Sequence, residues 1–299
     1  MMINSVGLFG QTYYEDTRDY LQELITLINE QGWNLIVEEN YHQQLQDAGI
    51  LADTIETYSK PEDLKTKINL MFTIGGDGTI LRAITYIKDS GIPILGINTG
   101  RLGFLATIQK TEIKRAFECV LNEQYKITER VVLQVSTIPE HPELKENNFA
   151  LNEISVARQN TASMIGVETH LDETYLTNYF ADGLIVATPT GSTGYSLSCG
   201  GPVIDPKSNS LVITPIAPHN LNARPLVLSN DTKIDLKVEG RIQDFLLSLD
   251  SRLISVPANS GIHINKADFT IPIISLKDRT FYETLRSKLL WGEDTRNHK

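Results

Sequence analysis

The sequence predicts an α/β N-terminal domain with a parallel sheet, followed by a mainly β, sandwich-like C-terminal domain. Strand and helix patterns alternate over residues 1–126, as in βαβ units. Short β-rich runs separated by turn residues fill residues 127–276, as in an antiparallel sandwich. Residues 277–299 carry a last amphipathic pattern, which we expect to be a helix that packs back on the first domain.

The first domain takes its helices from the spacing of apolar residues. Apolar side chains recur at helical spacing over Asp16–Gln31, and Gly32 provides a C-terminal stop. Ser59–Glu62 predicts the entry to another helix, because proline is favoured in a first turn. The expected strands are Ser5–Phe9, Trp33–Val37, Leu70–Ile74 and Ile92–Ile97, and the remaining helices begin at Thr79 and span Thr111–Leu121.

The second domain consists of short runs rich in β-branched and apolar residues, with turn residues between them. The helix expected after them is Arg279–Trp291, with apolar residues on one side. The expected strands are Val131–Ser136, Leu151–Val156, Ser163–His170, Gly183–Ala187, Leu211–Ile216, Pro225–Leu228, Lys233–Val238, Phe245–Leu249 and Phe269–Ile274.

The composition excludes several classes of protein. With 41% hydrophobic and 21% charged residues, the 299-residue chain is an ordinary globular protein. It has no apolar run of about 18 residues and no signal-peptide pattern, so we expect a cytoplasmic protein without membrane contact. The two cysteines, far apart and outside any C-x-x-C pair, argue against a disulfide framework. A net charge of −10 without a basic cluster argues against nucleic acid as a partner.

The most informative segment is Gly-Gly-Asp-Gly-Thr at Gly75–Thr79. It follows an apolar strand and leads into a helix, an arrangement that presents backbone N–H groups to an anion. Asp77 would repel a bare phosphate, so it is expected to hold a metal ion or to accept a proton from a hydroxyl. Asp and Gly are also ordinary turn residues. A turn without function is therefore the alternative for this segment taken alone.

Two further segments are rich in glycine and short polar residues. Gly96–Leu105 follows the next strand, so its glycine turn would lie beside the first at the carboxyl edge of a parallel sheet, where ligands bind. Asp182–Pro202 begins with an apolar strand and continues with glycines and hydroxyls, which let backbone approach a ligand closely. The alternatives are an ordinary βα loop and a serine-rich linker.

Common fingerprints of other enzymes are absent from the sequence. Gly201–Ser208 lacks the second glycine of a P-loop, and Leu81 stands where a dinucleotide-binding G-x-G-x-x-G needs its third glycine. The six histidines form no H-x-x-x-H pair. Gly191–Gly194 is one residue short of the G-x-S-x-G of serine hydrolases. These absences disfavour a Walker ATPase, a Rossmann dehydrogenase, a histidine metal site and a serine hydrolase.

Taken together, the segments resemble the NAD kinase family. Gly75–Thr79 is similar to its signature, which diacylglycerol, sphingosine and 6-phosphofructo-kinases share, and Asn98–Leu105 is similar to its second motif. Asn152 and Glu153 match a pair that contacts the nucleotide, and Asp182–Pro202 resembles a segment more specific to NAD kinases. The resemblance implies transfer of the ATP γ-phosphoryl group to the 2′-hydroxyl of the adenosine ribose of NAD, giving NADP.

The resemblance also implies roles for individual residues. Asp77 would be the proton acceptor, with Gly78 beside it in the NAD-binding turn. The residues implied to contact NAD in addition are Asn152, Glu153, Asp182, Thr193, Gly194, Tyr195, Ser196, Leu197, Ser198 and Ala217. Further phosphate or nucleotide contacts are expected from Gly75, Gly76, Thr79, Arg82, Asn98 and Arg252, the last standing where many relatives have glutamine.

The implied partners are NAD and ATP, together with a divalent ion, Mg²⁺, whose ligands the sequence does not identify. By resemblance we expect a homodimer or a homotetramer. Two alternatives stay open. One is a lipid or sugar kinase that shares the Gly75–Thr79 turn, and the other is a non-catalytic NAD(P)-binding sensor. An intact Asp77 argues against the sensor, and the Asn152–Glu153 pair argues against the other kinases.

Overall fold

The computed structural model describes residues 3–159, 163–220 and 222–292. The chain forms two compact units. Unit 1 comprises Met1–Glu129 and Ile271–Lys299, and unit 2 is Arg130–Thr270. The sequence analysis places its boundaries after residues 126 and 276, and the last part of its C-terminal segment, 293–299, lies outside the described residues. Two long strands, β7 (Tyr125–Ile138) and β18 (Gly261–Leu276), carry the chain from one unit to the other.

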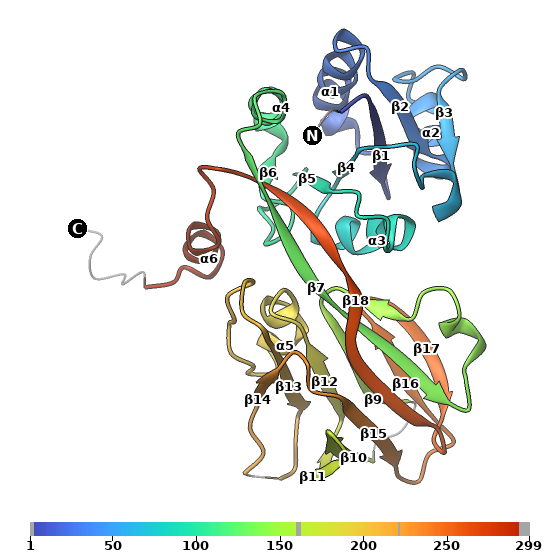
Figure 1. The fold of residues 1–299 in the computed structure, drawn as a ribbon, viewed down its shortest axis with the longest axis vertical. Helices are drawn as coiled ribbons and strands as arrows, with labels where there is room; N and C mark the ends of the chain where they lie inside the picture. Colours follow the sequence, from blue (N-terminus) through green and yellow to red (C-terminus); the bar gives the residue numbers. More distant parts are fainter. Residues whose placement is uncertain (1–2, 160–162, 221, 293–299) are drawn as a thin grey trace. The chain divides into compact units, whose positions relative to one another are not determined.

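Unit 1 contains a parallel sheet with the strand order β3-β2-β1-β4-β5 (Figure 1). The end of β18 joins it in parallel, where Ile273 pairs with Ile94 of β5. The strands are β1 (Ser5–Gly10), β2 (Asn34–Glu38), β3 (Glu56–Tyr58), β4 (Leu70–Ile74), β5 (Ile94–Asn98) and β6 (Ile108–Gln109), and the helices are α1 (Arg18–Glu30), α2 (Glu39–Asp47), α3 (Asp77–Ile87), α4 (Ile113–Leu121) and α6 (Phe281–Leu289).

Helices cover both faces of this sheet, because successive side chains of a strand point to opposite faces. Leu8 belongs to the apolar cluster in which α1 and α4 bury Leu24 and Phe117. Its neighbour Phe9 points the other way, where its ring lies 5.4 Å from that of Tyr86 on α3. The strand order reverses between β1 and β4. In doubly wound folds, ligands bind at the carboxyl ends of the strands at such a reversal.

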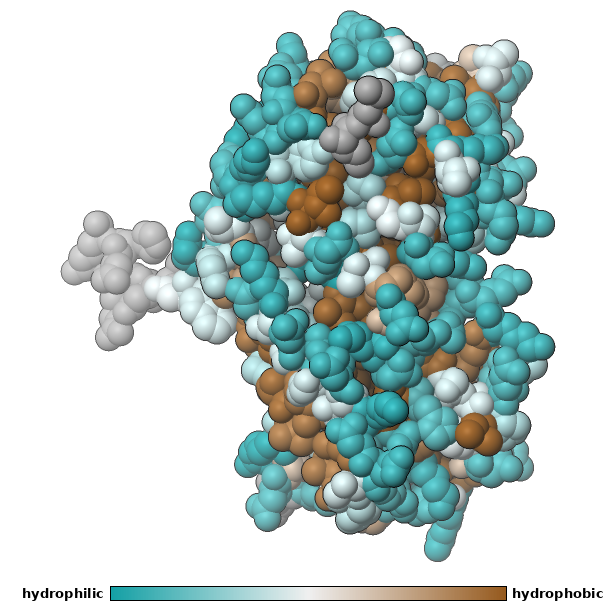
Figure 2. Space-filling view, in the orientation of Figure 1, coloured by the Kyte–Doolittle hydropathy of each residue, from teal (hydrophilic) through white to brown (hydrophobic). Residues whose placement is uncertain are grey.

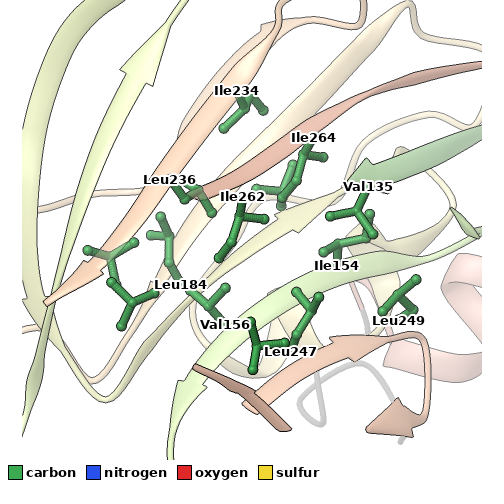
Figure 3. Packing of buried hydrophobic residues seen from close by; sticks show 14 of the residues in the cluster. Val135, Ile154, Val156, Leu184, Ile234, Leu236, Leu247, Leu249, Ile262 and Ile264 are labelled. Carbon is green, nitrogen blue, oxygen red and sulfur yellow. The ribbon is translucent and has the colours of Figure 1, made fainter. Parts of the chain in front are cut away.

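Unit 2 has two antiparallel layers around one apolar core. One sheet has the order β14-β13-β12-β9-β16-β17, and the other layer contains β11, β10, β15 and β18, with β7 and β8 added. Val156 and Leu247 of the first layer meet Leu236 and Ile262 of the second in the core (Figure 3). The bounds are β8 (Phe149–Ala150), β9 (Glu153–Arg158), β10 (Ile165–Leu171), β11 (Thr174–Ala181), β12 (Gly183–Ala187), α5 (Tyr195–Ser198), β13 (Ser210–Ile216), β14 (Leu226–Ser229), β15 (Ile234–Glu239), β16 (Asp244–Leu249) and β17 (Arg252–Pro257).

These layers confirm the predicted fold class, an α/β domain with a mainly β domain and a C-terminal helix on the first domain. The helix expected from Ser59–Glu62 is wrong, since only a 3₁₀ turn, Pro61–Asp63, forms there. Leu64 is the one buried side chain over residues 59–67, so a longer helix would have no apolar face to pack. Seven further elements are not predicted from the sequence: α2, β3, β6, β8, β11, α5 and β17.

The surface is mainly polar. Figure 2 shows hydrophilic residues over much of the face in view, with apolar residues between them. Among the described residues, no helix has the length and apolar character that a membrane crossing requires.

Candidate functional site

The Gly-Gly-Asp-Gly-Thr turn joins β4 to α3 at the reversal of the strand order. Gly75 has a φ of 146°, which L side chains rarely adopt, and a Cβ there would lie 2.2 Å from Thr79 Oγ1. Thr79 is buried, and its N–H donates to the carbonyl of Gly76 at 3.0 Å. Gly76 and Gly78 are exposed. The turn therefore presents open backbone on both sides of Asp77, the first residue of α3.

The carboxylate of Asp77 accepts hydrogen bonds from three consecutive backbone N–H groups. Phe104 donates to Oδ2 at 2.8 Å, while Leu105 and Ala106 donate to Oδ1 at 3.0 Å and 2.9 Å. We call residues 103–106 the amide cradle. The two glycine turns predicted from the sequence thus meet through the one acid that they contain.

Asn98 supports this loop from beneath. Its side chain is buried, and its Nδ2 donates to the carbonyl of Ala106 at 3.3 Å, while its Oδ1 accepts from the N–H of Gly100 at 2.8 Å. The side-chain amide is therefore used within the loop. Asn98 as a direct nucleotide contact stays a prediction.

Arg82 is exposed on α3 and lines a polar cavity of about 420 Å³. The cavity opens at the carboxyl ends of β1 and β2, and its lining also includes Thr12 and Asn40. A cationic side chain at the ligand edge of the sheet suits the phosphate contact predicted for Arg82.

In unit 2, Asn152 and Glu153 stand at the start of β9, and Asp250 holds their backbone. The N–H groups of Asn152 and Glu153 donate to Asp250 Oδ1 at 2.8 Å and 3.2 Å, and that of Leu151 donates to Oδ2 at 3.0 Å. Asp250 has a positive φ of 56°. The sequence analysis misses this role, and the only signal for it is an aspartate in the turn between β16 and β17.

Glu153 is 8% exposed. Burial, and then the nearby charge of Asp250, raise its pKa to about 8, against a smaller opposing effect of the Tyr195 backbone. Among the described residues, neither Glu153 Oε2 nor Asn152 Oδ1, both buried, has a hydrogen-bond partner. Buried polar atoms are normally paired. Asn152 and Glu153, the pair that the sequence predicts to contact the nucleotide, thus each keep one oxygen without a hydrogen-bond partner.

The glycine- and hydroxyl-rich segment packs directly on the Asn152–Glu153 turn. Thr188 donates from its N–H to the carbonyl of Asn152 at 2.8 Å and from Oγ1 to that of Leu151 at 2.6 Å. A Cβ on Gly191 would lie 2.1 Å from the Asn152 carbonyl oxygen, and one on Gly194 would lie 3.2 Å from Glu153 Oε2. Small residues are therefore required here for close packing.

The residues of α5 and the turn before it differ in how they are placed. Ser196 is buried and its Oγ lies 2.8 Å from Thr214 Oγ1, and Thr193 Oγ1 donates to the carbonyl of Thr190 at 3.2 Å. Tyr195 and Ser198 are exposed, and Leu197 is half-buried. The exposed pair is therefore more accessible to a ligand than Ser196.

Asp182 and Ala217 lie together, at the other end of β12 from Glu153. The N–H of Asp182 donates to the carbonyl of Ile216, next to Ala217, and Asp182 Oδ1 pairs with Arg158 Nε at 2.9 Å. The two ends of β12, Gly183 and Ala187, lie four residue steps apart, and Ala187 pairs with Glu153; four steps are about 13 Å of strand. Tyr195 is exposed, and its pKa is raised by burial of part of the side chain and then by the nearby Cys199, Asp182 and Glu153.

Arg252 engages the backbone that leads to the Asn152–Glu153 turn. Its guanidinium donates to the carbonyls of Asn147 and Phe149 and lies over the Phe149 ring, with 5.3 Å between Cζ and the centroid. This placement stabilises the start of the turn from within unit 2. A nucleotide contact of Arg252 stays a prediction.

The described residues contain no group of three or more His, Cys, Asp and Glu side chains arranged to hold a metal ion. Carboxylates are nonetheless present in both units, at Asp77 and at Asp250 with Glu153.

A glycine turn that offers both backbone N–H groups and an acid, at the ligand edge of a parallel sheet, suits a nucleotide-dependent phosphotransferase. Comparison with known families agrees. Residues 6–125 match the ATP-NAD kinase N-terminal domain, and residues 151–276 match the ATP-NAD kinase C-terminal domain. The chain belongs to the NAD kinase family.

Similar proteins extend over almost the whole chain. An NAD kinase of Flavobacterium psychrophilum is 48% identical over 98% of this chain and 99% of its own length, and one of Christiangramia forsetii is 49% identical over the same shares. Among solved structures, yeast NADH kinase complexed with NADH matches with a TM-score of 0.86 and 25% identity, over 99% of this chain and 90% of that one. An NAD kinase from Archaeoglobus fulgidus in complex with ATP matches with a TM-score of 0.70 and 28% identity, over 96% and 98%.

Proposed function

We infer that this protein is an NAD kinase, which transfers the γ-phosphoryl group of ATP to the 2′-hydroxyl of the adenosine ribose of NAD and forms NADP. The observation that carries this inference is the placement of Asp77. Its carboxylate stands at the N-terminus of a helix, between two exposed glycines, where a phosphate and an alcohol would meet. The similarity to NAD kinases over both units supports the choice of substrates.

The chemistry suits a carboxylate. A ribose hydroxyl is too weak an acid for a carboxylate to deprotonate before attack. Phosphoryl transfer proceeds through a loose transition state, in which the nucleophile needs little prior deprotonation. Asp77 would therefore orient the hydroxyl and accept its proton late, while the N–H groups at the start of α3 stabilise the negative charge of the transferring group.

Unit 2 would supply the residues that bind NAD. Because the pKa of Glu153 is raised to about 8, this side chain is mainly protonated at neutral pH and offers both a donor and an acceptor. Asn152 Oδ1 adds a second free acceptor. Tyr195, whose side chain is exposed, would offer an aromatic surface for a base or a nicotinamide ring.

A divalent ion, which we expect to be Mg²⁺, would neutralise charge on the ATP phosphates. The oxygens that fit it are mostly those of the substrate, since Mg²⁺ keeps water and phosphate ligands and needs few from the protein. The assembly is proposed to be a homodimer or a homotetramer in the cytoplasm.

The test is a coupled assay in which purified protein, NAD, ATP and Mg²⁺ are incubated and NADP is detected with an NADP-specific dehydrogenase. Asp77→Asn should lower turnover by about 10²- to 10⁴-fold, the usual contribution of a general base, and leave NAD binding by calorimetry intact. Asp89→Asn, at an exposed position of the same unit, is the control and should keep full activity.

Other outcomes point to other proteins. NAD binding without any NADP would favour an NAD(P)-binding sensor. Neither turnover nor binding would favour a lipid or sugar kinase. Near-normal turnover of Asp77→Asn would show that Asp77 is not the proton acceptor.

A further inference from the structure

We propose that the amide cradle, Gly103 included, positions the carboxylate of Asp77 and leaves it a single acceptor position, on Oδ2, for the alcohol substrate. The proposal rests on the proposed function, because it concerns how the same acid meets its hydroxyl. It assigns a role to Gly103 and to three backbone N–H groups rather than to another reactive side chain.

The carboxylate of Asp77 keeps one acceptor position free for a substrate. An ionised carboxylate offers about four lone pairs, two on each oxygen. In Asp77, Oδ1 accepts from both Leu105 and Ala106, so its lone pairs are used. Oδ2 accepts from Phe104 alone. One lone pair, on Oδ2, is left for a hydroxyl, and its direction is fixed because the other three hydrogen bonds fix the plane of the carboxylate.

Gly103 provides the space beside the acid. A Cβ on Gly103 would lie 1.9 Å from Asp77 Oδ1 and 2.7 Å from Cγ. Gly103 is not among the glycines with positive φ. Its backbone would therefore accept another residue, and what requires glycine is the approach of the carboxylate. A methyl group at this position would displace the short Asp77 side chain from the cradle without straining the loop itself.

The cradle itself is held rigidly. The N–H of Gly103 donates to the carbonyl of Ala106 at 3.1 Å, and the Asn98 side chain donates to the same oxygen. At the other end, the centroid of the Phe104 ring lies 6.1 Å from that of the Phe281 ring of α6 and 5.4 Å from Lys288 Nζ. Contacts on both ends hold the three donors in place, so the cradle is preorganised before substrate arrives.

The decisive variant is Gly103→Ala. Displacing the acid by an ångström or more should lower kcat by about 10²-fold, with the KM for ATP little changed. Gly261→Ala is the control in unit 2, where the new methyl group would meet only His263 Nε2 at 3.7 Å, and it should keep wild-type kinetics. In an Asp77→Ala background, Gly103→Ala should cost nothing more, because the group it displaces is gone. A full additional loss there, or wild-type kcat for Gly103→Ala alone, would overturn the proposal.

A readout that needs no turnover separates this proposal from the proposed function. Hydrogen exchange of the amides of residues 104–106, followed by NMR, should be faster in Gly103→Ala and in Asp77→Ala than in the wild type. If these amides exchange as slowly in both variants as in the wild type, the proposed cradle is overturned even if NADP is formed. A wild-type protein that protects these amides but forms no NADP would overturn the proposed function alone. Should Gly103→Ala fail to fold, Asp77→Glu serves instead, since its longer side chain keeps the acid but cannot enter the cradle, and the same exchange and kcat losses are expected.

Discussion

The two units each contain a carboxylate that accepts three consecutive backbone N–H groups, with two on one oxygen and one on the other. In unit 1 the acid is Asp77 and the donors are residues 104–106. In unit 2 the acid is Asp250 and the donors are residues 151–153. The hydrogen-bond patterns match, but the surroundings do not. Asp77 is flanked by exposed glycines, whereas Asp250, which is half-buried, lies beside the buried Glu153.

The difference shows that one motif serves two opposite purposes. In unit 1 the loop holds the acid, which stays open to a substrate. In unit 2 the acid holds the loop, and its own burial raises its pKa despite the three N–H groups and Arg252, which oppose that rise. The charge of Asp250 then helps to raise the pKa of Glu153. Asp250 therefore shapes the Asn152–Glu153 turn both through hydrogen bonds and through its charge.

Removal of each acid should separate the two roles most clearly. Asp250→Ala would leave the N–H groups of residues 151–153 without an acceptor, so the free energy of unfolding should fall by on the order of 3 kcal/mol. Asp77→Ala should cost less, about 1 kcal/mol, because the exposed glycines on either side of Asp77 let water replace the lost carboxylate. Urea unfolding followed by circular dichroism measures both. Equal losses for the two variants would contradict the distinction between Asp250, which stabilises its loop, and Asp77, which its loop positions.

Glu153→Gln should change how stability depends on pH. The pKa of Glu153 is about 8 in the folded chain and 4.5 as a free group. Folding therefore retains a proton between these values, so the contribution of Glu153 to stability is complete below pH 4.5 and is lost as the pH rises to about 8. Across this range the wild type should lose on the order of 5 kcal/mol relative to the glutamine variant.

The measurement is the urea midpoint of both proteins at several pH values. Above about pH 8 the two curves should run parallel, because Glu153 is then ionised in both states. Parallel curves over the whole range would mean that Glu153 titrates normally and that Asp250 has no electrostatic effect on it.

Arg252→Met should change the free energy of unfolding less than Asp250→Ala or Glu153→Gln does. It removes two hydrogen bonds to the carbonyls of Asn147 and Phe149 but keeps an apolar stem, so a loss of about 1–2 kcal/mol is expected. The KM for ATP and for NAD should stay close to the wild type. Arg241→Met, at an exposed position of unit 2, is the control. A large rise in either KM at unchanged stability would instead support the nucleotide contact that the sequence predicts.

The sequence predicts elements well where a strong apolar pattern meets a glycine boundary. β12 forms over Gly183–Ala187, as expected, because an apolar run there starts at a glycine. Prediction from the sequence fails where the burial of an element depends on partners far along the chain. α2 is mostly polar and buries only Tyr41, His42 and Leu45, and its N-terminus is fixed by Glu38, which accepts from the N–H of Tyr41.

The candidate site follows the same division. Asp77, Asn152 and Glu153 are recognisable because side chains at fixed spacing carry the signal. Gly103 and Asp250 give no such signal. Gly103 matters because a Cβ there would meet the carboxylate of Asp77 from another loop, and Asp250 acts through backbone N–H groups 97 to 99 residues away. Every residue but proline has such a donor, so side-chain identity gives no sign of which ones an acid will choose.

Unit 1 is assembled from both ends of the chain, and this has a consequence for its biosynthesis. β18 enters the sheet beside β5, and Phe281 of α6 reaches Phe104. Unit 2 is one continuous segment, Arg130–Thr270. A ribosome therefore releases all of unit 2 before it releases the residues that complete unit 1, and domains fold as units during synthesis. Unit 2 can therefore fold first, and the sheet that carries Asp77 is completed only after β18 and α6 have left the ribosome.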